Sequence, residues 1–149
     1  MRPYKLALFL CMALVPAISG CTKNESASPS DVAPPDAAST LRVYYFHRSI
    51  RCPSCEKIEA LAQRAVEEGF AGELAAGTVQ WRAVNIDEAP DQHFEKEYEL
   101  RTQSVIVSEV RGGKETRWKN LEQVWDLLND DSDFVRYVQD EVRAFGQET

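Results

Sequence analysis

The stretch that decides the fold is Leu41-Arg42-Val43-Tyr44-Tyr45-Phe46, followed closely by Cys52-Pro53-Ser54-Cys55. The β-branched and aromatic residues of the first segment predict a strand that is buried on both faces. A helix is predicted after the first cysteine, because apolar residues recur at helical spacing. These residues are Ile58, Leu61, Ala62, Ala65, Val66 and Phe70.

The remaining pattern continues as alternating strands and helices. Two turn signals divide it: Gly112-Gly113 predicts a hairpin, and Asn129-Asp130-Asp131-Ser132 predicts a break and a helix cap. Three further strands are predicted at Val79–Ile86, Val105–Val110 and Lys114–Trp118. Three further helices are predicted at Asp91–Tyr98, Leu121–Leu128 and Phe134–Phe145. With the last two helical segments, divided by the break at 129–132, counted together, the order is βαβαββα, and Trp81, Trp118 and Trp125 are expected to be core residues.

Residues 1–20 have the pattern of a bacterial secretory signal. Arg2 and Lys5 precede an apolar run that is too short to cross a bilayer. Ile18-Ser19-Gly20-Cys21 then resembles a lipobox, the site at which lipoprotein processing acylates the cysteine and leaves it as the new N-terminus. By that resemblance residue 21 carries lipid, and the protein belongs to the bacterial cell envelope, on its periplasmic side. A threonine at position 22 favours the outer membrane.

Residues 21–40 are expected to be a disordered tether, because they contain Pro, Ser and Ala but no aromatic residue. Residues 41–149 then form one domain, long enough for a single core. The chain has 17 Lys and Arg against 24 Asp and Glu, a formal net charge of -7. This balance argues against nucleic acid and against close docking on anionic lipid, so contact with the membrane is expected through the lipid at Cys21.

Cys52 and Cys55 are the cysteine pair that remains after the signal and the lipid site are accounted for. Spaced i and i+3 at a helix start, they place their Cα atoms within the roughly 4.4 to 6.8 Å of a disulfide. Cys52 faces the positive end of the helix dipole, so it is the expected nucleophile, and Cys55 is the expected resolving thiol. Pro53 suits the first helical position.

Charged residues around the cysteine pair are expected to tune it. Arg48, Arg51 and Lys57 cluster near the motif, and cations beside a thiol lower its pKa. His47, five residues before Cys52, could tune or protonate a thiol, although a histidine at a strand end is also common in a purely structural role. No cofactor is expected beyond a redox-active disulfide between the two cysteines.

The arrangement resembles the thioredoxin fold over the whole of residues 41–149. The matching segments are the CPSC motif after the first strand, Val84-Asn85-Ile86-Asp87 at the end of the second, and Tyr98-Glu99-Leu100-Arg101 before the third. The resemblance implies an α/β fold with a central mixed four-stranded sheet flanked by helices. It also implies exchange with a protein or small-molecule thiol or disulfide as partner.

Three positions depart from the thioredoxin pattern. Ser104 stands where that family has a cis-proline that faces the disulfide, pairs with substrate and keeps metal away from the thiols. Tyr45 falls near the place of the family's buried acid, and Arg51 replaces the tryptophan before the first cysteine. These departures put ordinary protein disulfide exchange in question.

More narrowly, the lipobox, the Tyr-Tyr-Phe-His strand end and the basic approach to CxxC resemble a family of small bacterial lipoproteins. That family is the nitrophenyl compound nitroreductase subunit ArsF family, and the resemblance adds little about the chemistry.

Several alternatives to thiol-disulfide exchange remain open. The first is a soft-metal site for copper(I) or an arsenite-like thiophile, with Cys52, Cys55 and either His47 or Ser104 as ligands. A zinc site would need about four ligands, and the second histidine, His93, lies on a different predicted helix. The pair could also be a structural disulfide in an interaction module whose acidic C-terminal helices hold a partner.

Overall fold

The computed structural model describes residues 39–148, and the predicted signal peptide and lipidated Cys21 lie outside them. Four strands form one sheet: β1 Thr40–His47, β2 Val79–Asn85, β3 Ser104–Arg111 and β4 Lys114–Asn120. The α-helices are α1 Pro53–Gly69, α2 Ala71–Ala76, α3 His93–Glu97 and α4 Asp131–Gln147. Two short 3₁₀ helices, η1 Glu122–Val124 and η2 Asp126–Asn129, connect β4 to α4.

The sheet has the order β2-β1-β3-β4 and is mixed. Strand β1 runs parallel to β2 and antiparallel to β3, and β4 is antiparallel to β3. Parallel strands need a long crossover, which α1 and α2 supply between β1 and β2. The predicted α/β class, with a mixed four-stranded sheet flanked by helices, is confirmed.

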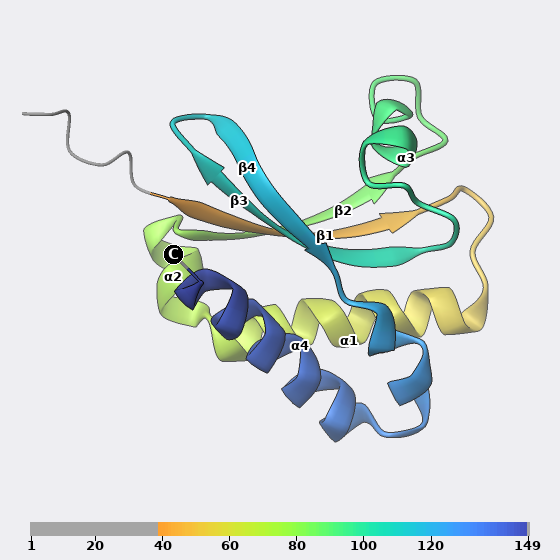
Figure 1. The fold of residues 1–149 in the computed structure, drawn as a ribbon. Coiled ribbons are helices and arrows are strands. Elements are labelled where there is room, and N and C mark those ends of the chain that lie inside the picture. Colours follow the sequence, from red (N-terminus) through yellow and green to blue (C-terminus); the bar gives the residue numbers. More distant parts are fainter. Residues whose placement is uncertain (1–38, 149) are drawn as a thin grey trace, which may run out of the picture. The chain divides into compact units, whose positions relative to one another are not determined.

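Two apolar layers cover the two faces of the sheet (Figure 1). Helices α1 and α4 pack together on one face, where their buried side chains form one cluster with those of β1 and β3, which includes Ile58, Phe134 and Tyr45. On the opposite face α3 lies above a smaller cluster that includes Phe46 and Tyr98. Four consecutive residues of β1, Val43 to Phe46, are therefore buried, as the sequence predicted.

Turn and cap chemistry also follows the prediction. Gly112 and Gly113 both have positive φ, at 58° and 79°, and they connect β3 to β4. Asp130 caps α4 by accepting hydrogen bonds from the backbone N–H groups of Ser132 and Asp133. The Asp130 side chain accepts hydrogen bonds from free N–H groups at the helix start, and the glycines adopt the positive φ that the hairpin needs. Both signals therefore locate the element boundaries to within a few residues.

Three predicted features need correction. The segment 121–128 forms two short 3₁₀ helices instead of an α-helix. It is too short to offset the cost of helix nucleation. In addition, the indole N–H of Trp125 donates a hydrogen bond to the carbonyl of Gln103, outside the segment. Helix α2 was not predicted as a separate element. It begins directly after Phe70, which is the C-cap residue of α1. Trp118 is 38% exposed and is not a core residue.

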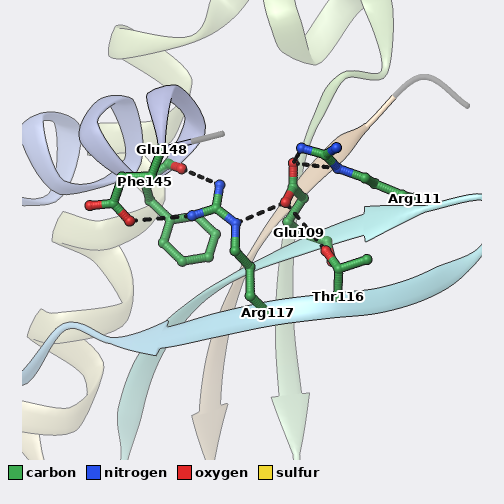
Figure 2. A network of polar contacts seen from close by, with 6 residues as sticks. All are labelled: Glu109, Arg111, Thr116, Arg117, Phe145 and Glu148. Carbon is green, nitrogen blue, oxygen red and sulfur yellow. Dashed lines mark hydrogen bonds and ion pairs between the residues drawn. The ribbon is translucent and has the colours of Figure 1, made fainter. Parts of the chain in front are cut away.

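A polar network joins β3, β4 and the end of α4 (Figure 2). The buried carboxylate of Glu109 accepts hydrogen bonds from Arg111 and Arg117. The guanidinium of Arg117 also donates to the carbonyl of Phe145 at 2.5 Å and lies over its ring. A cation at the carboxyl end of a helix is favoured by the dipole, so this network holds α4 against the sheet.

Within residues 39–148, no helix combines the length and the apolar character needed to cross a bilayer.

Candidate functional site

The cysteine pair lies where the chain passes from β1 into α1. Cys52 is the N-cap residue of α1, and Pro53 occupies the first helical position. The two cysteines form a disulfide with their Cα atoms 5.0 Å apart. The sulfur of Cys52 accepts a hydrogen bond from the backbone N–H of Cys55 at 3.1 Å. A negative charge on this sulfur would therefore face an N–H donor and the positive end of a helix of 17 residues.

The two cysteine residues differ in exposure. Cys52 is exposed, whereas Cys55 is only 2% exposed and packs in the first turn of the helix. A partner molecule can thus reach Cys52 directly, and Cys55 is reached through Cys52. This asymmetry is what an attacking thiol and a resolving thiol require.

Tyr45 lies beneath the pair. Its ring is fully buried, and its hydroxyl donates to the carbonyl oxygen of Cys55 at 2.7 Å. Burial raises the pKa of Tyr45 to about 12, although the nearby charge of Arg51 opposes the shift. The hydroxyl is therefore protonated and able to donate throughout the physiological pH range.

His47 is at the end of β1, half-buried. Its ring stacks on Tyr45 with 5.9 Å between centroids, and its Nδ1 is 3.1 Å from the carbonyl oxygen of Arg48. Across residues 39–148 there is no group of three or more His, Cys, Asp and Glu side chains placed to hold a metal ion.

The three cations near the motif each form an ion pair. Their partners are carboxylates: Arg48 pairs with Asp87 and Glu95, Arg51 with Glu59, and Lys57 with Asp131. Paired charges act less strongly on a distant thiol than free ones do. The start of α1 adds positive potential at Cys52 that no carboxylate of these ion pairs neutralises.

Ser104 begins β3 directly opposite Phe46 of β1. It is 5% exposed, and its hydroxyl donates to the carbonyl of Thr102 at 3.0 Å. No peptide bond among the described residues is cis. The approach to β3 therefore has an ordinary trans backbone at the position where the sequence lacks a proline.

Asp87 is a site residue that sequence reasoning missed. Its carboxylate accepts a hydrogen bond from the backbone N–H of Ser49 at 2.8 Å and pairs with Arg48. The Ser49 N–H is the main cause that holds the pKa of Asp87 below its ordinary value. Asp87 thus anchors the loop that leads to Cys52. Its place directly after a strand that is parallel to β1 was the available signal, because parallel strands end at the same edge.

The strand order, the parallel pairing of β1 with β2, the antiparallel pairings of β3 with β1 and β4, and the CxxC motif define a thioredoxin-like fold with a disulfide at the start of α1.

Three solved structures are similar to this chain. The thioredoxin of Trypanosoma brucei brucei is 19% identical over 68% of this chain and 80% of its own, with a TM-score of 0.40. The thioredoxin of Fasciola hepatica is 16% identical over 66% and 81%, with a TM-score of 0.38. A malarial protein is 12% identical over 54% and 80%, with a TM-score of 0.37. No family model and no curated protein matches the chain. The fold assignment rests on the strand order of the structure itself.

Proposed function

We propose that the protein is a thiol-disulfide oxidoreductase, with Cys52 as nucleophile and Cys55 as resolving thiol. The observation that carries the proposal is the unequal access of the two sulfurs in a disulfide at a helix start. A purely structural disulfide gains nothing from an exposed sulfur at an N-cap, whereas an exchange reaction requires it.

The reaction proceeds in two exchanges. The thiolate of Cys52 attacks one sulfur of a substrate disulfide, so that a mixed disulfide forms and the other substrate sulfur leaves as a thiolate that takes up a proton. The thiol of Cys55 then loses its proton and attacks the sulfur of Cys52. The second substrate thiolate leaves, and two electrons have passed to the substrate. In the opposite direction the same steps oxidise a dithiol.

The local geometry supports each step. The N–H of Cys55, 3.1 Å from the sulfur of Cys52, can stabilise the attacking thiolate, and the Tyr45 hydroxyl fixes the carbonyl of Cys55. Asp87 holds Ser49, which limits how far the loop before Cys52 can move. Pre-arranged groups of this kind lower the cost of ordering the site during reaction.

We further propose that the domain is tethered to the bacterial envelope through lipid on Cys21. The support is the lipobox-like Ile18-Ser19-Gly20-Cys21 after a short apolar run, together with the resemblance to the ArsF family of lipoproteins. Incorporation of a labelled fatty acid into the wild-type chain, and its loss in Cys21→Ser, would establish the anchor. Recovery of the wild-type protein in the soluble fraction, without the labelled fatty acid, would rule out the lipid anchor.

The deciding experiment is a redox titration of the Cys52–Cys55 pair against glutathione. A reversible two-electron transition is expected between roughly -120 mV, the range of strong oxidants, and about -270 mV, the range of thioredoxin. Its position gives the direction of electron flow. A transition well below about -300 mV, or none, would indicate a structural disulfide instead.

A second candidate function, soft-metal binding by the reduced pair, is favoured by one observation. Ser104 replaces the proline that shields thiols from metal, and as the first residue of β3 it pairs with Phe46, one residue before the end of β1. Titration of the reduced protein with copper(I) separates the two candidates. If copper(I) binds tightly and Cys52→Ser abolishes the binding, the metal site is supported. If binding is weak and the substitution leaves it unchanged, the metal site is ruled out.

A further inference from the structure

A cavity of about 410 Å³ opens at the end of β3 and β4, apart from the cysteine pair. It lies between the segment that follows α3, the first residue of β3, the last residues of β4 and η1. This volume is within the roughly 300 to 1,000 Å³ of small-molecule and side-chain binding pockets. Its main lining residues are Tyr98, Glu99, Arg101, Trp118, Glu122 and Trp125, and we refer to it as the Trp118 cavity.

Aromatic rings form the walls of the Trp118 cavity. The ring of Tyr98 meets that of Trp118 edge to face, with 5.3 Å between centroids and an interplanar angle of 87°. The indole of Trp125 is fixed from behind by its hydrogen bond to the carbonyl of Gln103. Trp118 and Ile50 are the large hydrophobic residues most exposed in the described part of the chain. An indole held in place and left open to solvent is a ready surface for a ligand.

Charged side chains at the cavity lack partners. Glu99, Arg101 and Glu122 are all exposed, and none of their side chains forms a hydrogen bond or an ion pair with another described residue. This distinguishes them from Arg48 and Arg51 near the cysteines, which are paired. Two carboxylates against one guanidinium leave the cavity with an excess of negative charge.

Glu99 is held in an unusual conformation at the cavity wall. Its φ is 51°, in the left-handed region, and it directly follows Tyr98, the C-cap residue of α3. The N–H of Leu100 bonds the carbonyl of Glu95, and the N–H of Glu99 bonds that of Lys96, which is the hydrogen-bond pattern of a Schellman cap. Glycine is the usual residue at this position, so a glutamate there has a conformational cost.

We propose that the Trp118 cavity binds a basic side chain, arginine or lysine, of a partner polypeptide. A guanidinium or ammonium over the indole of Trp118 gains a cation–π interaction, and the unpaired carboxylates of Glu99 and Glu122 supply opposite charge. The net charge of -7 on the whole chain also favours association with a basic partner.

The cavity lies at the same end of the sheet as the cysteine pair, although binding in the cavity does not require thiol chemistry. Ser104 lines the cavity and stands opposite Phe46, near the end of β1. The loop that carries Cys52 leaves the sheet at this same end (Figure 1). A partner anchored in the cavity is therefore held at the end of the sheet where the exposed sulfur lies.

Arg101 gives the proposal a test with a definite sign. Its guanidinium lines the cavity and weakens the field of the two carboxylates. If the ligand is cationic, Arg101→Gln strengthens binding; if the ligand is anionic, the same substitution weakens it. Glu122→Gln must act in the opposite direction. Each change at an exposed charge is expected to alter the dissociation constant by about two- to fivefold.

The experiment is a titration of the oxidised full chain with three blocked pentapeptides, Gly-Gly-X-Gly-Gly, in which X is arginine, glycine or glutamate. The indole N–H signals of Trp81, Trp118 and Trp125 are followed by NMR, with Trp118→Phe used to assign the Trp118 signal. Saturable shifts of the Trp118 signal with the arginine peptide alone are expected. Arg101→Gln should tighten that binding and Glu122→Gln should weaken it, while Glu68→Gln, an exposed and unpaired carboxylate on α1, leaves it unchanged.

Three results would overturn the proposal. They are the absence of any shift at millimolar peptide, equal shifts with the glycine and arginine peptides, or tighter binding of the glutamate peptide that Arg101→Gln weakens. Because the titration uses oxidised protein, failure of the exchange reaction would not affect it. Conversely, an empty cavity would leave the reactivity of the cysteine pair untouched.

Discussion

The hydroxyl of Tyr45 donates a hydrogen bond to the carbonyl oxygen of Cys55, with 2.7 Å between the two oxygens. The bond joins the buried strand β1 to the first turn of α1, directly beneath the cysteine pair. Since the pKa of Tyr45 is raised to about 12, the donor keeps its proton throughout the physiological pH range. The bond fixes the backbone at Cys55 without adding a titrating group.

Tyr45→Phe should remove this bond with little change in packing. We expect the free energy of unfolding to fall by about 1 kcal/mol, the usual net value of one buried hydrogen bond. Urea denaturation of the oxidised protein measures it. Tyr44→Phe is the matched control, because Tyr44 is buried on the opposite face of the sheet and its hydroxyl forms no hydrogen bond with a described residue. Equal losses in the two variants would contradict the role of Tyr45.

Single cysteine variants should separate the roles of the two sulfurs. Cys55→Ser is expected to stop at a stable mixed disulfide with oxidised glutathione, detectable by mass spectrometry, because no resolving thiol remains. Cys52→Ser should react at least about tenfold more slowly, since the remaining thiol is only 2% exposed. Reaction of both variants at similar rates would show that access does not distinguish the two sulfurs.

Asp87→Ala should loosen the loop before Cys52. Without its acceptor, the amide of Ser49 is expected to exchange with solvent roughly tenfold faster, as measured by hydrogen exchange. Because the N–H of Ser49 holds the pKa of Asp87 below its ordinary value, acid should release the loop in the wild type only below the usual range of carboxyl titration. Asp126→Ala, at an exposed aspartate in η2, is the control and should leave Ser49 unaffected.

Local rules account for much of what the sequence predicted correctly. Cys52 as N-cap, Pro53 at the first helical position and Asp130 as a cap each depend on backbone groups within a few residues, so sequence spacing is enough to find them. The same holds for the Gly112-Gly113 hairpin, where positive φ is required at both positions.

Long-range contacts were beyond the reach of sequence spacing. Asp87 meets Ser49 only because β1 and β2 are parallel and end at one edge of the sheet. The carboxylate partner of Arg51, Glu59, could be placed only once the direction of each side chain on α1 was known. Trp118 was expected in the core because it is large and apolar, yet it lies on the outer strand and contacts Tyr98 from the solvent side.

Glu99→Gly tests whether the glutamate after the α3 cap contributes to binding while it weakens the fold. Glycine adopts positive φ without steric cost, so the substitution should stabilise the fold by about 1 kcal/mol. A rise of several degrees in Tm follows for a domain of this size. The same variant should bind the arginine peptide more weakly, because one carboxylate of the cavity is lost. A fall in Tm would mean that the Glu99 side chain itself stabilises the cap.

The network around Glu109 should make stability depend on acid pH. Hydrogen bonds from Arg117, and then from Arg111, hold the pKa of this buried carboxylate at about 2 against the effect of burial (Figure 2). A depressed pKa in the folded state means that the contribution is complete above the unfolded pKa of about 4.3 and is lost as pH falls toward 2. Glu109→Gln should therefore cost about 2 kcal/mol at neutral pH.

The difference between wild type and Glu109→Gln should then shrink as pH is lowered from about 5 to about 2, because protonation removes the same charge from the wild type that the substitution removes from the variant. Denaturation at a series of pH values measures this convergence. Glu68→Gln is the control, since Glu68 is exposed and unpaired on α1 and should show little difference at any pH. Parallel stability curves for wild type and Glu109→Gln would mean that Arg117 holds α4 through the Phe145 carbonyl and Glu148, without help from Glu109.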